Sequence, residues 1–438
     1  MANLRKHLSA PALLKRIRTS FNSVPDHRAK KSNISMADTL MSGLAVFGLK
    51  YPSLLQFDKE KNDKVIRNNL KTLYGIQQAP CDTRLREILD PVKPEYLHSV
   101  FPDILHQVQR GKALEHYTFI DDHYLISIDG TGEFSSNKIS CPDCCQKNHR
   151  NGQTGYYHQL LGAVLVHPDQ AVVLPLTPEP ITRQDGTVKN DCERNAAKRL
   201  LSRLRTDHPR LKIIITEDGL SSNAPHIELI KSLNMHFILG AKPGDHTYLF
   251  NLMEEKADTN EVDTWQYTDT KGTLHCFYFA NDLPLNESHP ELLINVLHYI
   301  EIKENNKMQC FSWVTDFTLK EKTVFNIMKG GRARWKIENE TFNTLKNQGY
   351  HLGHNYGHGK QHLSTIFSLL MMLAFLVDQV QLLCCPLFQK ALKKRGTKIS
   401  FWARIRAFFV SHYIANWEVL FEAIISGHIA SDLQPDTS

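Results

Sequence analysis

The chain has 438 residues, of which 42% are hydrophobic and 22% are charged, and its formal net charge is +6. This ordinary globular composition is long enough for two or three domains, and it excludes a disordered or fibrous class of protein. The polar, basic start lacks an apolar core, which predicts that there is no signal peptide. Nine cysteines without such a signal are expected to be reduced thiols in a cytosol.

Residues 1–120 are predicted to form a helical region, because apolar residues recur at helical spacing over 36–47. Before that segment, the stretch from Met1 to Ser35 contains a single acid, Asp26, and eight basic residues: Arg5, Lys6, Lys15, Arg16, Arg18, Arg28, Lys30 and Lys31. A local positive field of this kind favours phosphate backbones, so we expect a basic DNA-binding arm. The expected DNA contacts in the arm are Arg16, Arg18, Lys30 and Lys31. A solvated arm without a partner is the alternative.

The stretch 121–245 changes to an alternation of strands and helices. The pattern predicts three strands over 124–129, 158–167 and 171–180, and then, in order, a helix over 190–209, a strand over 211–219, a helix over 224–234 and a strand over 236–242. This is the order of an RNase H-like core, in which an antiparallel meander continues through two right-handed crossovers into a mixed sheet. The predicted fold class is therefore α/β, or α+β overall.

The rest of the chain divides into three predicted parts. Short aromatic-rich strands over 246–325 indicate a β-rich insertion, and 326–385 is predicted to complete the core with a helix at 332–348 and an apolar helix at 361–383. The apolar run 366–377 is shorter than the ~20 residues of a membrane span, so a buried core helix and no membrane association are expected. Residues 386–438 are predicted to be a helical C-terminal region, with an amphipathic helix at about 401–426.

Two predicted neighbouring strands end in an aspartate followed by glycine, Asp129-Gly130 and Asp218-Gly219. Carboxylates at the ends of adjacent strands repel each other unless a proton or a cation separates them. Hard oxygen ligands suit Mg²⁺ or Mn²⁺. The alternative is that each aspartate only begins a turn.

A third acid is expected from the helix at 332–348. If Trp335, Phe342 and Leu345 define its buried face, Glu338 falls in the middle of that face and Glu340 falls nearly opposite, toward solvent. A buried carboxylate is costly unless it is paired or bound to metal, which favours Glu338. Arg334 stands one turn earlier, where it would either form an i,i+4 ion pair with Glu338 or contact a DNA phosphate.

Three stretches, SIDGTG (127–132), IITEDG (214–219) and RARWKIENETFNTLK (332–346), together resemble bacterial DDE transposases of insertion-sequence family four. The resemblance covers roughly residues 35–385. It implies an RNase H-like core with a β-rich insertion before the catalytic glutamate, and a Tyr-Arg-Glu-Lys signature on the last helix. Gly331 stands where the signature has tyrosine. Leu345 stands at the lysine position, with Lys346 one residue later.

The resemblance also implies residue roles and partners. Asp129, Asp218 and Glu338 would be the metal-binding catalytic triad for two Mg²⁺ or Mn²⁺ ions, and Arg334 would be the signature arginine. Lys346 would supply the signature lysine. Trp335 would either stack on a flipped base or pack in the core, and core packing is the favoured alternative. The implied partners are the terminal inverted repeats and the target DNA, with a homodimer at the DNA ends in a bacterial, nucleoid-associated cytoplasm.

The sequence CPDCCQKNH supplies Cys141, Cys144, Cys145 and His149, in which Cys-x₂-Cys is the spacing of half a zinc site. His158 or Cys192 would be the fourth ligand, but there is no second Cys-x₂-Cys knuckle, and packed reduced thiols are the favoured alternative. The histidines at 351, 354, 358 and 362 lie in a glycine-rich loop. They are expected to contact DNA phosphate or to form structural hydrogen bonds rather than to bind metal.

Two further function classes stay open. One is a catalytically inactive, transposase-derived DNA-binding protein, and the other is a hydrolytic RNase H-like nuclease without strand transfer. The intact acids favour an active enzyme over the first, and the basic N-terminal segment and the β-rich insertion favour transposition over the second.

Overall fold

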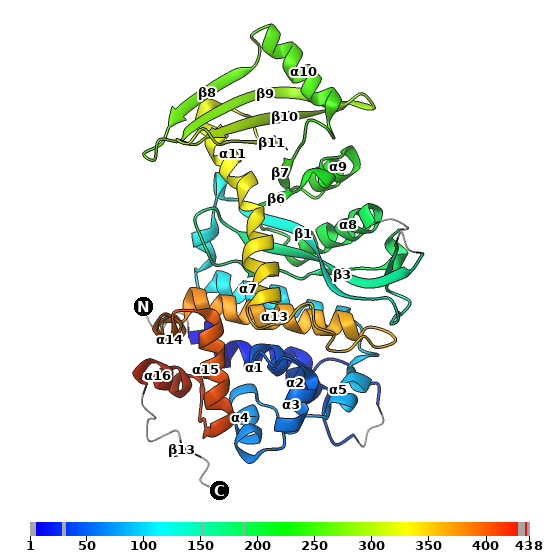
Figure 1. Ribbon diagram of the computed structural model, residues 1–438, viewed down its shortest axis with the longest axis vertical. Coiled ribbons are helices and arrows are strands. Elements are labelled where there is room, and N and C mark those ends of the chain that lie inside the picture. The colour runs from blue at the N-terminus through cyan, green and yellow to red at the C-terminus, as the bar shows by residue number, and fades with distance from the viewer. Residues whose placement is uncertain (1–5, 29–31, 150–151, 187–188, 428–433, 436–438) are drawn as a thin grey trace.

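A computed structural model describes residues 6–28, 32–149, 152–186, 189–427 and 434–435. The molecule is elongated, with an antiparallel sheet at one end, the core sheet in the middle and a group of helices at the other end (Figure 1). One mixed sheet of 11 strands passes through the first two parts, in the order β2-β3-β1-β6-β7-β11-β10-β9-β8, with β4 and β5 both paired to β3. The fold is therefore mixed α/β, of the α+β kind that the sequence predicts.

The core strands follow the predicted RNase H-like order. Their bounds are β1 Tyr124–Ser136, β2 Cys145–Asn148, β3 Thr154–Val166, β4 Leu174–Pro175, β5 Glu179–Ile181, β6 Ile213–Glu217 and β7 His236–Gly240. β1 is antiparallel to β3 and parallel to β6, which is parallel to β7. The third predicted strand is split into β4 and β5, with Pro178 between them. Proline has no N–H to donate to a strand ladder, which explains the interruption.

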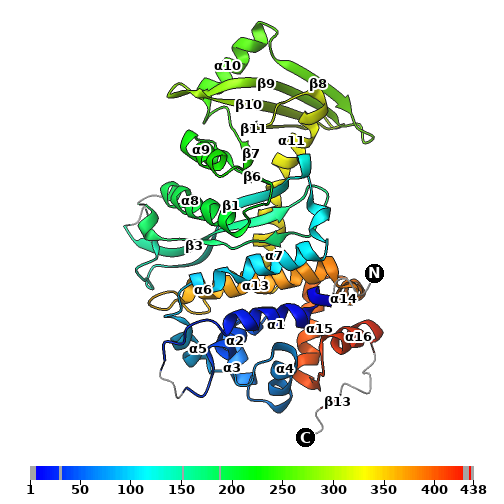
Figure 2. The same cartoon turned by 180° about the vertical axis from the view of Figure 1, so that it is seen from behind.

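Helices cover both faces of the core sheet. Helices α8 (Lys189–Asp207) and α9 (Ala224–Ser232) lie on one face, and α11 (Glu321–Ala333) crosses the other, as the two opposite views show (Figures 1 and 2). All five residues of β6 are buried between these layers. Burial on both faces explains the unbroken apolar run of three isoleucines, Ile213–Ile215, with which this strand begins.

The insertion consists of α10 (Thr247–Asp258) and four antiparallel strands, β8 Asp263–Thr268, β9 Leu274–Asn286, β10 His289–Ile302 and β11 Met308–Thr315. β11 pairs with the core strand β7, with Val314 opposite Leu239. The insertion sheet is therefore a continuation of the core sheet rather than a separate layer. Its aromatic side chains stack on one another across the strands, as Tyr299 of β10 does on Phe311 of β11 at 6.2 Å between ring centroids.

The helices at the far end come from both ends of the chain. The N-terminal ones are α1 Ala10–Phe21, α2 Met36–Gly48, α3 Leu54–Glu60, α4 Lys64–Tyr74, α5 Asp82–Leu89, α6 Glu95–His98 and α7 Val100–Arg110. The C-terminal ones are α13 Leu363–Cys384, α14 Pro386–Arg395, α15 Lys398–Ser411 and α16 Trp417–Ser426. Asn69 of α4 donates from Nδ2 to the carbonyl oxygen of Phe409 at 2.8 Å, which ties the two groups together. The single helix predicted over 401–426 is two helices, because Asn416 caps the start of α16.

Over α1, the basic N-terminal segment is packed into the fold rather than extended as a free arm, and its contact with DNA stays a prediction. This helix buries Leu13, Ile17 and Phe21 in the core, and both of its predicted DNA contacts are held in ion pairs. Arg16 pairs with Asp103 at 3.0 Å, and Arg18 pairs with Asp38 at 2.8 Å. The apolar residues spaced along α1 explain the difference, because they give the segment a face that packs. Lys30 and Lys31 lie outside the described residues.

The apolar helix α13 is the one described helix long and apolar enough to cross a membrane, judged by length and composition. Within the fold, 83% of its most apolar window is buried. It lies between the core sheet and the terminal helices (Figure 1). Its hydrophobic surface is therefore used in the core, as the sequence predicts.

One prediction for stability arises from the buried histidine at the end of α8. His208 is 6% exposed, and burial lowers its pKa from 6.5 to about 4. The unfolded chain takes up a proton below pH 6.5, whereas the folded protein does not, so this contribution is complete above that pH and is lost as the pH falls toward 4. We expect a loss of about 2 kcal/mol in the free energy of unfolding between pH 7.5 and pH 5. In the His208→Gln variant, the free energy of unfolding measured in urea should lack this part of the pH dependence. A pH profile equal to that of the wild type would contradict the assignment of the effect to His208.

Candidate active site

Asp129 and Asp218 occupy equivalent positions on two neighbouring strands, just beyond the last paired residues of β1 and β6. Asp218 follows the end of β6, whereas β1 continues past Asp129 to Ser136 and does not end at residue 129 as predicted. Ser127 of β1 is opposite Thr216 of the parallel strand β6, and each aspartate comes two residues later. Adjacent strands lie about 4.8 Å apart, so the two carboxylates leave the sheet side by side. Backbone N–H groups orient both of them, since Gly130 donates to Asp129 Oδ1 at 2.8 Å and Leu220 donates to Asp218 Oδ1 at 3.0 Å.

A helical segment closes over this edge of the sheet because a glycine lets it approach. Gly162 of β3 is opposite Asp129, and a Cβ atom there would lie 3.0 Å from Phe342 Cζ and 3.4 Å from Ile337 Cδ1. Both of these side chains come from a π-helical turn, Ile337–Phe342, which α12 (Asn343–Asn347) continues. Ser127 adds a hydrogen bond from its Oγ to the carbonyl oxygen of Arg334 at 2.9 Å.

The predicted helix phase is wrong, although Glu338 still faces the aspartates. Trp335, taken as part of the buried face, is 50% exposed, and Glu338 is also exposed. Glu340, predicted to face solvent, is half-buried and acts electrostatically on Lys336 and Lys398. The π-helical turn explains the error, because its i→i+5 bonding changes the angle between successive side chains from that of the α-helix used for the prediction.

The electrostatics of Asp129 reflect the convergence of the three predicted acids. The pKa of Asp129 is raised to about 6, mainly by burial and also by the negative charges of Asp218 and Glu338, against the opposing effects of the Arg334 guanidinium and the Gly130 N–H. Arg334 Nη1 lies 3.2 Å from Asp129 Oδ2. Among the described residues, its ion pair is with Asp129 and not with Glu338. Three carboxylates beside one arginine leave an excess of negative charge. Their oxygen atoms could serve as the ligands of a hard divalent cation.

A further acid, Glu193 of α8, approaches the same part of β1 from the opposite face of the sheet. A Cβ atom on Gly130 would lie 3.1 Å from Glu193 Oε1. Successive side chains of a strand point to opposite faces, so Glu193 meets the α8 side of β1, whereas the Asp129 carboxylate is on the side of Arg334. Glu193 therefore does not belong to the acid group around Asp129.

The other residues of the signature helix differ in their exposure. The Arg334 guanidinium lies over the exposed Trp335 ring, 5.3 Å from its centroid. The core-packing alternative for Trp335 is therefore wrong. Lys346 is exposed, whereas Leu345, which stands at the signature lysine position, is completely buried.

Gly331 packs directly against Trp313 of β11, because a Cβ atom at Gly331 would lie 2.2 Å from the Trp313 Nε1 atom. A tyrosine could not be placed here without moving that ring. A glycine-to-alanine change inside a helix normally stabilises it by about 0.5–1 kcal/mol. We instead expect Gly331→Ala to lower the free energy of unfolding by about 1–3 kcal/mol because of the overlap. Urea unfolding would measure this, with recovery expected in the double variant Gly331→Ala/Trp313→Leu. A gain in stability in the single variant would show that the ring is free to move.

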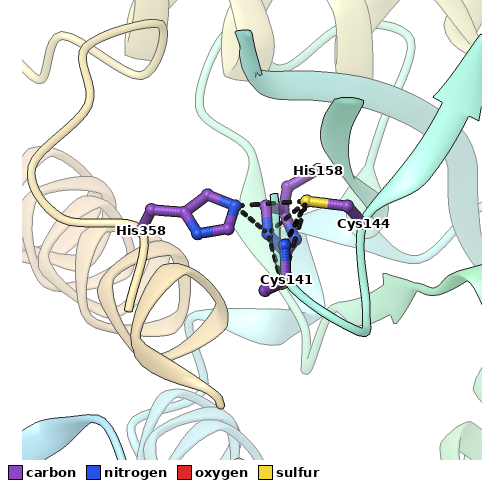
Figure 3. Close-up of side chains that lie close together, drawn as sticks. All are labelled: Cys141, Cys144, His158 and His358. Atoms are coloured by element: carbon purple, nitrogen blue, oxygen red, sulfur yellow. Dashed lines mark hydrogen bonds between the residues drawn. The ribbon is translucent and has the colours of Figure 1, made fainter. Parts of the chain in front are cut away.

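A second cluster of side chains lies further along the β1–β3 pair, where Phe134 is opposite His158 (Figure 3). The Cys141 and Cys144 Sγ atoms are 3.7 Å apart, and they lie 3.4 and 3.5 Å from His158 Nε2. His358 Nε2 is 3.1 Å from the Cys144 Sγ atom and 3.2 Å from His158 Nε2. The hydrogen bond between the two thiols lowers the pKa of Cys141 and raises the pKa of Cys144.

Two of the four predicted zinc ligands are thus in the cluster, and two are not. The Cys145 thiol points to the carbonyl oxygen of Ile181 at 3.7 Å, because Cys145 begins β2 and its side chain is on the buried face. His149 lies at the other end of β2, where its ring packs against Gly155. His158, considered as a fourth ligand, does belong to the cluster.

Of the two roles predicted for the glycine-rich histidine loop, His358 has structural hydrogen bonds, to Cys144, His158 and the Gly359 carbonyl, and it is 8% exposed. The spacing of the four histidines could not separate it from the others. His354 packs against Tyr356 with 4.9 Å between ring centroids, and His362 Nδ1 lies 3.9 Å from an Asp143 carboxylate oxygen. Only the folding of the loop onto β3 distinguishes His358.

Comparison with known proteins identifies no relative of this chain among protein families or curated sequences. No model of a known protein family matches the chain. No curated protein sequence matches it either.

Proposed function

We propose that this protein is a DNA transposase of a bacterial insertion sequence, which cuts DNA at the element ends and joins them to a target. The single observation that carries the proposal is the convergence on Asp129 of the charges of Asp218, Glu338 and Arg334 at one edge of an RNase H-like sheet. These residues come from two strands and a distant helix. Their meeting at the open end of the strands matches what the sequence resemblance implies.

Asp129, Asp218 and Glu338 would hold two Mg²⁺ or Mn²⁺ ions, which when bound would promote in-line attack at phosphorus. In the first step, a water oxygen would bond to the phosphorus at the element end and the O3′–P bond would break, leaving a 3′-hydroxyl. In the second step, that hydroxyl oxygen would bond to a target phosphorus, and the target O3′–P bond would break. Arg334, which holds Asp129 in its metal-free form, would turn to the phosphate when DNA is bound.

The proposal extends to partners and location. Double-stranded DNA of the terminal repeats and the target would lie across the edge of the sheet that carries the acids, with Trp335 and Lys346 exposed on the same helical segment. Two ends would be joined by two copies of the chain, and the protein would act on the bacterial nucleoid in the cytoplasm.

The proposal is tested with the full chain and a duplex taken from the DNA that flanks its coding region. We expect a cut with a free 3′-hydroxyl at the end of an inverted repeat, dependent on Mg²⁺ and absent in EDTA or on a scrambled repeat. Degradation of any duplex would overturn the proposal in favour of a hydrolytic nuclease. Binding of the repeat without cleavage would overturn it in favour of an inactive DNA-binding protein.

A further inference from the structure

We propose that Cys141, Cys144, His158 and His358 bind one structural Zn²⁺ ion that connects the β1–β3 hairpin to the loop before α13. The four side chains come from three separate segments and converge on one point (Figure 3). Their four ligand atoms all lie within 4.8 Å of one another, and three of the four residues are buried. This inference does not rest on the proposed function, because such an ion would be bound equally by an inactive protein.

The distances between the ligand atoms match the edges of a zinc tetrahedron. With Zn–S bonds of about 2.3 Å and Zn–N bonds of about 2.05 Å, tetrahedral angles require separations of about 3.8 Å for S–S, 3.6 Å for S–N and 3.3 Å for N–N. The separations in the protein are 3.7 Å between the thiols, 3.4, 3.5 and 3.1 Å for three thiol–imidazole pairs, and 3.2 Å between the imidazoles. Five of the six separations are therefore within about 0.5 Å of those of a four-coordinate zinc ion, and the sixth, between Cys141 and His358, is at most 4.8 Å.

The orientation of His358 supports a metal over a set of ordinary hydrogen bonds. His358 Nδ1 lies 3.1 Å from the Gly359 carbonyl oxygen, which can only accept. Nδ1 must therefore carry the proton, and in the neutral ring Nε2 presents a lone pair to the cluster. A backbone carbonyl that fixes the outer nitrogen in this way is the usual support of a metal-bound histidine. The two thiols are too far apart for a disulfide, which needs about 2.05 Å.

Four protein ligands leave no open position on the ion, which assigns it a structural rather than a catalytic role. His158 and His358 are 200 residues apart in the chain, so the ion would close a long loop and restrict the unfolded chain. His158 pairs with Phe134 on the same two strands that place Gly162 opposite Asp129. The ion would therefore fix the loop that follows the Glu338 segment to β3, the strand paired with the one that carries Asp129.

The test measures metal content in the full-length protein, purified under reducing conditions without chelator. We expect about one zinc ion per chain by elemental mass spectrometry. The zinc content of the Cys144→Ser and His358→Gln variants should each fall below about 0.2 ions per chain. The matched variants Cys145→Ser and His354→Gln change a neighbouring cysteine and a neighbouring loop histidine that lie outside the cluster. Both variants should keep about one zinc ion per chain. A wild-type protein that holds less than about 0.2 zinc after reconstitution, or a His358→Gln variant with undiminished zinc, would overturn the proposal.

A measurement on the wild-type protein keeps the test valid if the variants do not fold. Cobalt(II) added to the metal-free protein should give the intense visible bands of a tetrahedral ion and a near-ultraviolet thiolate-to-cobalt band, and added zinc should bleach both. Weak bands of six-coordinate cobalt without the thiolate band would overturn the site, as would a Cys141–Cys144 disulfide in freshly purified protein. None of these readouts depends on DNA cleavage, so failure of the zinc site and failure of the proposed transposase are distinguished.

Discussion

Replacing Asp129 with asparagine is expected to reduce Mg²⁺-dependent cleavage of an element-end duplex by at least about a thousandfold, and Asp218→Asn and Glu338→Gln should do the same. The amides keep the shape of the side chains but cannot hold the cations. DNA binding, measured by gel shift in Ca²⁺ or EDTA, should stay within about threefold of the wild type, because the acids do not attract phosphate. Cleavage at the wild-type rate by any one variant would remove that residue from the triad.

Thermal unfolding separates a catalytic role for Asp129 from a structural one. Burial and the charges of two neighbouring acids raise its pKa to about 6. The ionised carboxylate therefore costs stability at neutral pH in the absence of metal. Asp129→Asn should leave the Tm unchanged or raise it while abolishing cleavage, and a large fall in Tm would indicate that the side chain mainly supports the fold.

Glu340→Gln is the matched control for Glu338→Gln. The two glutamates are two residues apart in the same π-helical turn. Glu340 acts on Lys336 and Lys398, whereas Glu338 acts on Asp129. We expect Glu340→Gln to keep cleavage within a few-fold of the wild type, and the opposite result for the two variants would place the third metal ligand at Glu340.

Removing Arg334 should have the second largest effect, with a fall in cleavage on the order of a hundredfold for Arg334→Ala. The guanidinium is the cation nearest to Asp129, and in the DNA complex it would meet the phosphate beside the cut. Arg334→Lys should recover part of the activity, since it keeps the charge but loses the planar fork that contacts two oxygens. The hydrogen bond from Ser127 goes to the backbone carbonyl of Arg334, so it should survive both substitutions.

The control for Arg334 is Arg332, on the same helical segment. Its guanidinium pairs with Glu301 in the insertion and lies over the Phe311 ring, away from the acids. Arg332→Ala should therefore leave cleavage within about threefold while lowering Tm slightly. If Arg334→Ala cleaves as well as Arg332→Ala, the contact with Asp129 is an ordinary ion pair.

Sequence patterns alone predicted the order of elements in the core, the α+β class and the buried position of α13. These features depend on local properties: alternation and runs of apolar residues, proline and glycine at turns, and the length of the apolar segment. The two aspartates were predicted to be neighbours for a related reason, because the topology of a right-handed crossover fixes which strand ends are adjacent.

The tertiary structure decided the features that depend on contacts between distant segments. The phase of the Glu338 segment follows from a π-helical turn packed on Gly162, and an α-helical projection could not reveal it. The N-terminal basic residues became ion-paired because α1 has an apolar face that packs in the helical end. His358 meets Cys144 across 214 residues, and only the path of the loop brings them to 3.1 Å. Local periodicity carries no information about such meetings, since long-range packing and loop closure determine them.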